Sequence, residues 1–123
     1  MEIKNLNKST FLDVMGDTPR NRILDFLISE NGFDYTLKEI AENSKVGYAT
    51  IKRIWNQFVK NNLVKETRRV GKAVFYKYDD KTNLGKKIKA FYLDILFASL
   101  EPDKRKAVKT QLKTGGKSIE VVA

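Results

Sequence analysis

The chain has 123 residues and a formal net charge of +9 at pH 7, and it contains neither cysteine nor histidine. This length suits one domain with a modest core, and the two missing residue types exclude disulfide scaffolds, thiol catalysis and metal sites built from cysteine or histidine. Residues 1–61 hold nine Lys and Arg against eight Asp and Glu, whereas residues 62–123 hold fifteen against seven, a clustering that suits a nucleic acid partner but also a plain lysine-rich surface.

Two helices are predicted first, from their capping residues. Ser9 can cap a short helix that ends at Gly16. Thr18 followed by Pro19 begins a second helix, which runs to about residue 31 and ends before Gly32. The apolar residues of the first helix are expected to cover the edge of the core: Phe11, Leu12, Val14 and Met15.

A third and a fourth helix are predicted on either side of a short break at residues 45–47. Thr36 and Glu39 form a capping box for a helix over residues 37–44. In the next helix, which begins near residue 48, one stripe at helical spacing is expected to be buried: Ile51, Ile54, Trp55 and Phe58. The opposite side is polar and cationic, in a stretch with no carboxylate from residue 47 to residue 65: it carries Ala49, Lys52, Arg53 and Asn56.

The segments VKETRRV and AVFYKY predict a β-hairpin over residues 64–78. Gly71 and Lys72 form its two-residue loop, in which Gly71 supplies the positive φ of a type II′ turn. This turn predicts three cross-strand pairs: Val70 with Ala73, Arg68 with Phe75, and Glu66 with Lys77. The buried face of the hairpin stays open, because both faces carry apolar side chains: Val74, Tyr76 and Tyr78 on one, and Val64, Val70 and Phe75 on the other.

A long helix is predicted from about residue 82 or 83 to Leu100, and Pro102 ends it. Its apolar surface is too wide for one side of a small domain, which favours a homodimer seam; burial within the protomer is the alternative. The residues expected at the seam are Leu84, Ile88, Phe91, Tyr92, Ile95 and Leu96. Residues 102–123 are rich in lysine and are expected to form a flexible basic tail or a frayed helix end.

This order of elements resembles the winged helix-turn-helix transcriptional regulators, especially archaeal ones in the neighbourhood of the ArsR and MarR types. Three segments within about residues 11–78 carry the resemblance: FLDVMGDTPRNRILDFL, TLKEIAENSKVGYATIKRI and NNLVKETRRVGKAVFYKY. The second segment matches the family in its small residue at the helix crossing, its apolar turn residue and its buried pair, which are Ala41, Val46, and Ile51 with Ile54. The family often has Gly where Lys45 stands and Ser where Gly47 stands.

The resemblance implies a mainly α fold with a small β-hairpin wing. Together with the apolar surface of the last helix and the lysine-rich composition that follows it, the resemblance divides the chain into a winged helix-turn-helix DNA-binding domain at residues 9–80, a long C-terminal dimerisation helix at residues 82–101 and the basic tail at residues 102–123. It also implies a homodimer that binds double-stranded DNA, with the helix that begins near residue 48 in the major groove and the wing on the backbone or in the minor groove.

Candidate DNA contacts follow from this arrangement and from the chemistry of the side chains. On the recognition helix the expected contacts are Tyr48, Ala49, Thr50, Lys52, Arg53 and Asn56. Gln57 lies nearer the flank of that helix and fits a DNA contact and a solvated side chain equally well. On the wing the expected contacts are Arg68, Arg69 and Lys72, as phosphate or minor-groove contacts.

Three other functions are weighed against this one. An enzyme is disfavoured, because the commonest general base and nucleophile are missing and no GxxxxGK phosphate loop occurs; no cofactor or metal is expected. The alternative is a winged-helix protein-interaction subunit of a transcription or replication assembly, or an antitoxin-like partner, whose outer helix face should be apolar or mixed in sign. RNA binding would display aromatic side chains for stacking, whereas most aromatics here occupy core or seam positions.

The predicted location is the cytoplasm. No N-terminal apolar segment of signal length is present, and the most apolar window, residues 90–98, is far shorter than the roughly 20 residues that span a bilayer. We therefore expect a soluble protein without a membrane partner. The sequence predicts neither an operator nor a small-molecule effector, and it does not distinguish a repressor from an activator.

Overall fold

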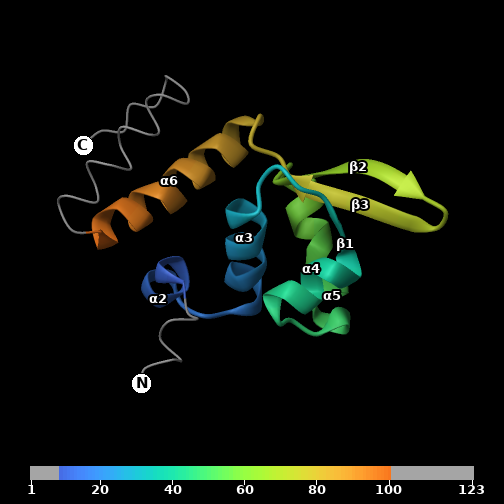
Figure 1. The fold of residues 1–123 in the computed structure, drawn as a ribbon, viewed down its shortest axis with the longest axis horizontal. Helices are drawn as coiled ribbons and strands as arrows, with labels where there is room; N and C mark the ends of the chain where they lie inside the picture. The colour runs from blue at the N-terminus through green and yellow to red at the C-terminus, as the bar shows by residue number, and fades with distance from the viewer. Residues whose placement is uncertain (1–8, 101–123) are drawn as a thin grey trace.

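A computed structural model describes residues 9–100 as a mainly helical fold with a small antiparallel sheet (Figure 1). The elements in chain order are α2 (Thr10–Met15), α3 (Pro19–Ser29), β1 (Tyr35–Thr36), α4 (Leu37–Ser44), α5 (Tyr48–Lys60), β2 (Val64–Val70), β3 (Ala73–Tyr78) and α6 (Asn83–Ser99). From the body of α3, α4 and α5, the β2–β3 hairpin extends in one direction and α6 in the other (Figure 1). Pro102 and the predicted basic tail lie outside the described residues.

The helices begin where the sequence predicts, and side-chain caps hold the first turns of α2, α3, α4 and α6, whereas α5 begins after Gly47 without a side-chain cap. The Ser9 hydroxyl accepts from the Leu12 N–H at 3.0 Å, and the Thr18 hydroxyl accepts from the Asn21 N–H at 3.1 Å. The capping box of α4 is complete and reciprocal. α3 ends at Ser29, two residues before the predicted end, because the chain beyond it changes to i→i−3 hydrogen bonds: the Asn31 N–H donates to the Ile28 carbonyl and the Phe33 N–H to the Glu30 carbonyl.

One core joins these helices, and the predicted stripe of α5 lies within it. Ile51, Ile54, Trp55 and Phe58 are all buried, as predicted. The expectation for α2 is wrong in part, because Val14 and Met15 are 61% and 43% exposed. A helix of six residues turns only one side toward the core, and the buried residue on that side of α2 is Phe11.

A third strand, β1, completes the sheet and was not predicted from the sequence. The strand order is β1-β3-β2, and β1 pairs antiparallel with β3, Tyr35 opposite Tyr76 and Thr36 opposite Phe75. Only two residues form this strand, and Thr36 also caps α4. A strand of that length is too short for any alternation of side chains to be visible in the sequence.

The hairpin has the predicted turn but a different register at its base. Gly71 has φ 62°, and Val70 faces Ala73 as expected. Beyond Arg68 the ladder is interrupted by a β-bulge at Thr67, so Glu66 faces Tyr76 and the predicted pair of Glu66 with Lys77 is wrong. An extra residue in one strand shifts every later pair by one position.

The bulge decides which face of the hairpin is buried. Val64 lies opposite Tyr78, and both are buried, at 5% and 1% exposed. Tyr76 packs its ring edge-on against Trp55, with 5.2 Å between ring centroids. Val70 is 55% exposed. The inner face therefore combines residues from both of the sets that the sequence left open.

The predicted seam on α6 is divided between the interior and the surface. Tyr92 and Ile95 are buried within the protomer, which is the alternative that the sequence left open. The Tyr92 ring packs on Phe11, and its hydroxyl donates to Asp25 Oδ1 at 2.8 Å. Ile88 and Leu96 are partly buried against the core, whereas Leu84 and Phe91 are exposed. Within residues 9–100, no helix is long and apolar enough to cross a membrane.

Candidate nucleic-acid interface

The turn between α4 and α5 sets the position of the candidate recognition helix, α5. Lys45 occupies the left-handed region, with φ 58° and ψ 45°, where the resembling family often has Gly. The Val46 N–H donates to the carbonyl of Ala41 at 2.9 Å, which closes the end of α4. Arg22 of α3 donates to the Lys45 carbonyl at 2.8 Å, and its Nε lies 2.5 Å from an oxygen of Asp17. A side chain of α3 thus holds the turn in place.

The outer face of α5 is exposed and free of acidic side chains. Tyr48, Ala49, Lys52, Arg53 and Asn56 are exposed, and Thr50 is partly buried. The Lys52 ammonium lies 5.1 Å from the centre of the Tyr48 ring, a cation–π contact. Neither the Arg53 nor the Asn56 side chain forms a hydrogen bond or ion pair with any other residue between 9 and 100. Their hydrogen-bonding groups face solvent, as a groove-binding helix requires.

Gln57 of α5 is hydrogen-bonded to a residue of α3 that was not among the predicted DNA contacts. Arg20, near the start of α3, donates from Nη1 to Gln57 Oε1 at 2.5 Å. Both side chains are exposed, and the two residues are 37 positions apart in the chain. The one local sign in the sequence that Gln57 belongs to this face is its position four residues after Arg53, which places the two on the same side of α5.

The wing arginines are less free than their sequence suggests. Arg68 makes two parallel hydrogen bonds to Asp34, from Nε at 2.9 Å and from Nη2 at 3.2 Å, and its guanidinium stacks on the Phe75 ring at 3.9 Å. Thr67, the extra residue of the bulge, donates to the same carboxylate at 2.6 Å. Hydrogen bonds from Arg68 and Thr67 lower the pKa of Asp34 to about 2.

Arg69 and Lys72 differ in whether they have an acidic partner. Arg69 donates to Glu66 from Nε at 2.7 Å and from Nη2 at 3.2 Å, and this guanidinium lowers the pKa of Glu66. Lys72, at the exposed tip, has no carboxylate partner within residues 9–100. Of the three wing cations predicted to contact DNA, Lys72 is therefore the one that can bind a phosphate without first leaving an acidic partner.

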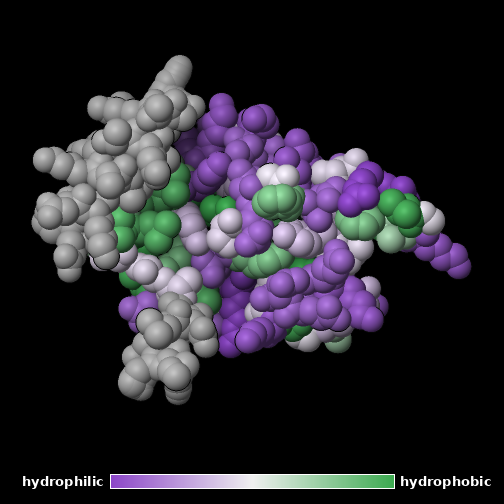
Figure 2. Space-filling view, viewed as in Figure 1, coloured by the Kyte–Doolittle hydropathy of each residue, from purple (hydrophilic) through white to green (hydrophobic). Residues whose placement is uncertain are grey.

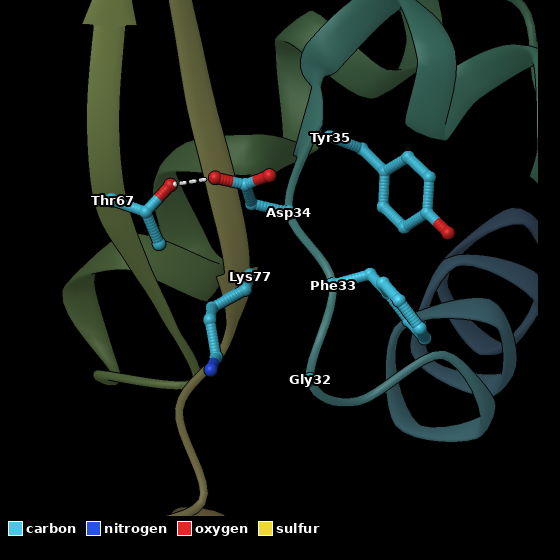
Figure 3. Close-up of a pocket in the computed structure, with 6 residues that line it drawn as sticks. All are labelled: Gly32, Phe33, Asp34, Tyr35, Thr67 and Lys77. Atoms are coloured by element: carbon cyan, nitrogen blue, oxygen red, sulfur yellow. Dashed lines mark hydrogen bonds between the residues drawn. The ribbon is translucent and has the colours of Figure 1, made fainter.

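The loop before β1 forms one side of a shallow, open pocket of about 400 Å³ beneath the wing (Figure 3). Its lining residues are Gly32, Phe33, Asp34, Tyr35, Thr67 and Lys77. Figure 3 shows Asp34 turned toward Thr67 across the pocket. Arg68 and Thr67 donate to both oxygens of this carboxylate, and these hydrogen bonds connect the loop to the wing. No acidic cluster suited to a metal ion occurs between residues 9 and 100.

Several solved structures share this fold. An apo form of a mutant of Lactococcus lactis ZitR is 14% identical, with 93% of this chain and 95% of that chain covered and a TM-score of 0.50. A MarR family transcriptional regulator from Silicibacter pomeroyi is 15% identical over 98% and 80% of the two chains, and reduced AbfR bound to DNA is 18% identical over 92% and 83%; both have a TM-score of 0.50. No family model matches the sequence, and no curated protein matches it.

These similarities concern the fold. The predicted class, a mainly helical winged helix with a small sheet, is confirmed, and it is of the kind found in MarR regulators. The archaeal and ArsR parts of the resemblance stay predictions, as do the three residue ranges assigned to separate parts of the chain. At identities of 14–18%, these similarities show the fold and say nothing of individual side chains.

Proposed function

We propose that this chain is a sequence-specific, double-stranded DNA-binding transcriptional regulator that acts as a homodimer. The observation that carries the proposal is the outer face of α5. It is exposed from Tyr48 to Asn56 apart from partly buried Thr50, and it presents two cations and an amide with no carboxylate beside them. An α-helix with such a face fits the major groove, where arginine and lysine bind guanine edges and asparagine binds adenine.

The solved structures support this assignment in one further way. One structure of the same fold holds reduced AbfR bound to DNA, and another is of a transcriptional regulator of the MarR family. A winged helix used for protein contact, which was the rival function, is expected to have an apolar or mixed-sign face at this place. The face of α5 is cationic and polar, so DNA is the better partner.

The proposed dimer uses the exposed part of α6. Leu84 and Phe91 are 44% and 47% exposed, and Figure 2 shows hydrophobic residues gathered at the α6 side of the molecule. Pairing through this surface would place two copies of α5 in successive major grooves, roughly 34 Å apart, on a nearly palindromic site. The wing of each protomer would lie on the flanking backbone. Tyr92 and Ile95, which are buried within the protomer, have little surface left for the seam.

Selection of bound sequences from random duplex DNA, at two salt concentrations, tests the proposal. The wild-type chain should enrich a two-fold symmetric site. Lys52→Ala and Arg53→Ala should each weaken binding to that site by about 5-fold to 100-fold, and at least one should relax a base preference, because each removes a donor from the groove. Lys86→Ala, which removes one exposed charge from α6, is the matched control.

The selection has two opposing outcomes. If both α5 variants lose the same affinity for the selected site as for random DNA, these side chains bind phosphates and do not select bases. If the wild-type chain enriches no sequence at either salt concentration, the regulator assignment is wrong.

A further inference from the structure

The hydrogen bond between Arg20 and Gln57 extends the candidate interface from α5 to α3. We propose that Arg20 is a DNA contact in its own right, and that it turns the amide N–H groups of Gln57 toward the DNA. This inference rests on the proposed function, since both side chains act on the nucleic acid that α5 binds.

The position of Gln57 follows from helix geometry. Ala49, Arg53 and Gln57 are spaced by four residues, so they lie on one side of α5, and all three are exposed. Gln57 is the last of the three and sits in the second half of α5. When a recognition helix enters a groove with its first turns, as in helix-turn-helix proteins, its later turns rise toward the sugar–phosphate rim. In the proposed complex, Gln57 and its neighbour Arg20 would therefore lie close to the backbone.

Arg20 has unused capacity for an anion. Its guanidinium carries five N–H groups, and one of them, on Nη1, donates to Gln57. Within residues 9–100 it pairs with no carboxylate, in contrast to Arg22, Arg68 and Arg69, each of which has an acidic partner. An exposed arginine beside a DNA-facing helix, with most of its donors free, suits a backbone phosphate oxygen.

The same hydrogen bond determines which end of the Gln57 amide is available to DNA. A guanidinium can only donate, so the amide oxygen of Gln57 must face it and the NH₂ group must point the other way. Glutamine usually recognises adenine with both ends of its amide, the oxygen accepting and the nitrogen donating. With the oxygen engaged by Arg20, Gln57 is set to donate to an acceptor, such as a guanine or thymine edge or a phosphate. Loss of Arg20 would release the oxygen and permit adenine.

A double-mutant cycle on the full chain tests both parts, with the selected site as the probe. Arg20→Ala should weaken binding at least about 5-fold and should lower the slope of log affinity against log salt by about 0.9, because one phosphate contact is lost. Arg20→Lys keeps the charge and should keep the slope. Gln57→Ala should relax one base position or weaken all sequences alike, which separates a base contact from a phosphate contact.

Coupling between the two residues gives the decisive result. The loss in the Arg20→Ala, Gln57→Ala double variant should be smaller than the two single losses combined, because removing either residue already disrupts the shared contact. Thermal unfolding should be the same in every variant, since both side chains are exposed. Lys86→Ala is again the matched charge control.

Each other outcome counts against the inference. If Arg20→Ala binds as Lys86→Ala does, Arg20 lies outside the interface, while the proposed function stands on the α5 variants. If both residues matter but their losses add, Arg20 binds DNA without positioning Gln57, and that half is wrong. If the wild-type chain selects no DNA sequence, the inference and the proposed function are both wrong.

Discussion

Asp34 is the residue on which the wing arginine depends, although nothing in its local sequence marks it. It precedes β1, and its two oxygens accept from Arg68 and from Thr67, 34 and 33 positions later. Arg68 is consequently held between a carboxylate and the Phe75 ring. Such a pair fixes the direction of the guanidinium, which a free side chain on a hairpin tip would not have.

Acid should weaken this contact within a defined pH range. The pKa of Asp34 is about 2 in the folded chain and 3.8 without its partners. Because the folded value is the lower one, the unfolded chain binds more protons between these values, so the contribution to stability is present above about pH 4 and is lost as the pH falls through about 2. Thermal unfolding of the wild-type chain and of Asp34→Asn, measured between pH 2 and pH 6, should show a gap that narrows toward pH 2. A gap of constant size would contradict this assignment.

The two long-range pairs also show where sequence reasoning stops at the residue scale. Ser9, Thr18 and Thr36 were predicted as caps because each bonds an amide only three residues away. The Arg20–Gln57 and Asp34–Arg68 bonds join residues more than 30 positions apart, and no spacing rule connects them before the fold is known. The charges were visible, but their partners were not.

At the scale of elements, the wing combines a predictable turn with an unpredictable bulge. Gly71 and Lys72 specify the loop, since Gly tolerates the positive φ of the turn. The Thr67 bulge depends on the loop before β1, which supplies the carboxylate that Thr67 binds. A pairing rule applied to the two strands alone therefore gives the correct pairs near the tip and incorrect pairs at the base.

The wing cations should differ in their effect on DNA binding. Lys72→Ala should weaken binding to all sequences alike and lower the salt slope by about 0.9, since Lys72 has no acidic partner within residues 9–100. Arg68→Ala should have the smaller effect on the slope, because Arg68 must exchange Asp34 for a phosphate. Titration of a duplex at several salt concentrations measures both. A larger effect from Arg68 would mean that DNA displaces Asp34 readily.

The junction between β3 and α6 allows no side chain at Gly85. A Cβ there would lie 2.0 Å from the carbonyl oxygen of Asp79 and 2.8 Å from Oγ1 of Thr82, the cap of α6. Gly85→Ala should therefore lower the free energy of unfolding by about 1 to 3 kcal/mol, as overpacked sites do. Denaturant titration measures the loss. Lys86→Ala, one exposed position further on, should change it by less than about 0.5 kcal/mol, and equal midpoints for both variants would contradict the overpacking.

At the scale of the whole molecule, the buried faces were more predictable than the exposed ones. The stripe of α5 is buried as its spacing indicates, because a helix in a small domain has one core to face. α6 has a wide apolar surface, and its spacing did not show that Tyr92 packs on Phe11 of its own protomer. Which apolar residues meet the chain's own core and which remain for a second chain depends on how α2 and α6 cross.

The oligomeric state can be tested at the exposed part of this surface. Phe91→Glu places a charge on a side chain that is 47% exposed in the protomer, so the fold should be retained while a seam there should open. Sedimentation should change from dimer to monomer. Lys86→Glu, which also alters charge on α6, should leave the dimer intact. If Phe91→Glu sediments as the wild type does, the seam lies elsewhere.

Two hydrogen bonds tie the start of α6 to the base of the hairpin, and a third closes that base. The Tyr78 hydroxyl donates to the Gly85 carbonyl at 2.6 Å, the Thr82 hydroxyl to the Asn62 carbonyl at 3.0 Å, and the Asp79 N–H to the Leu63 carbonyl at 2.9 Å. Tyr78 is itself 1% exposed. In the proposed dimer this junction would hold α6 and the winged helix-turn-helix in a fixed orientation. A tilt of one α6 against the other would then move the whole DNA-binding unit as a rigid body. The dimer would then accept only one spacing between the two half-sites, and an insertion of half a helical turn between them in the operator should abolish binding.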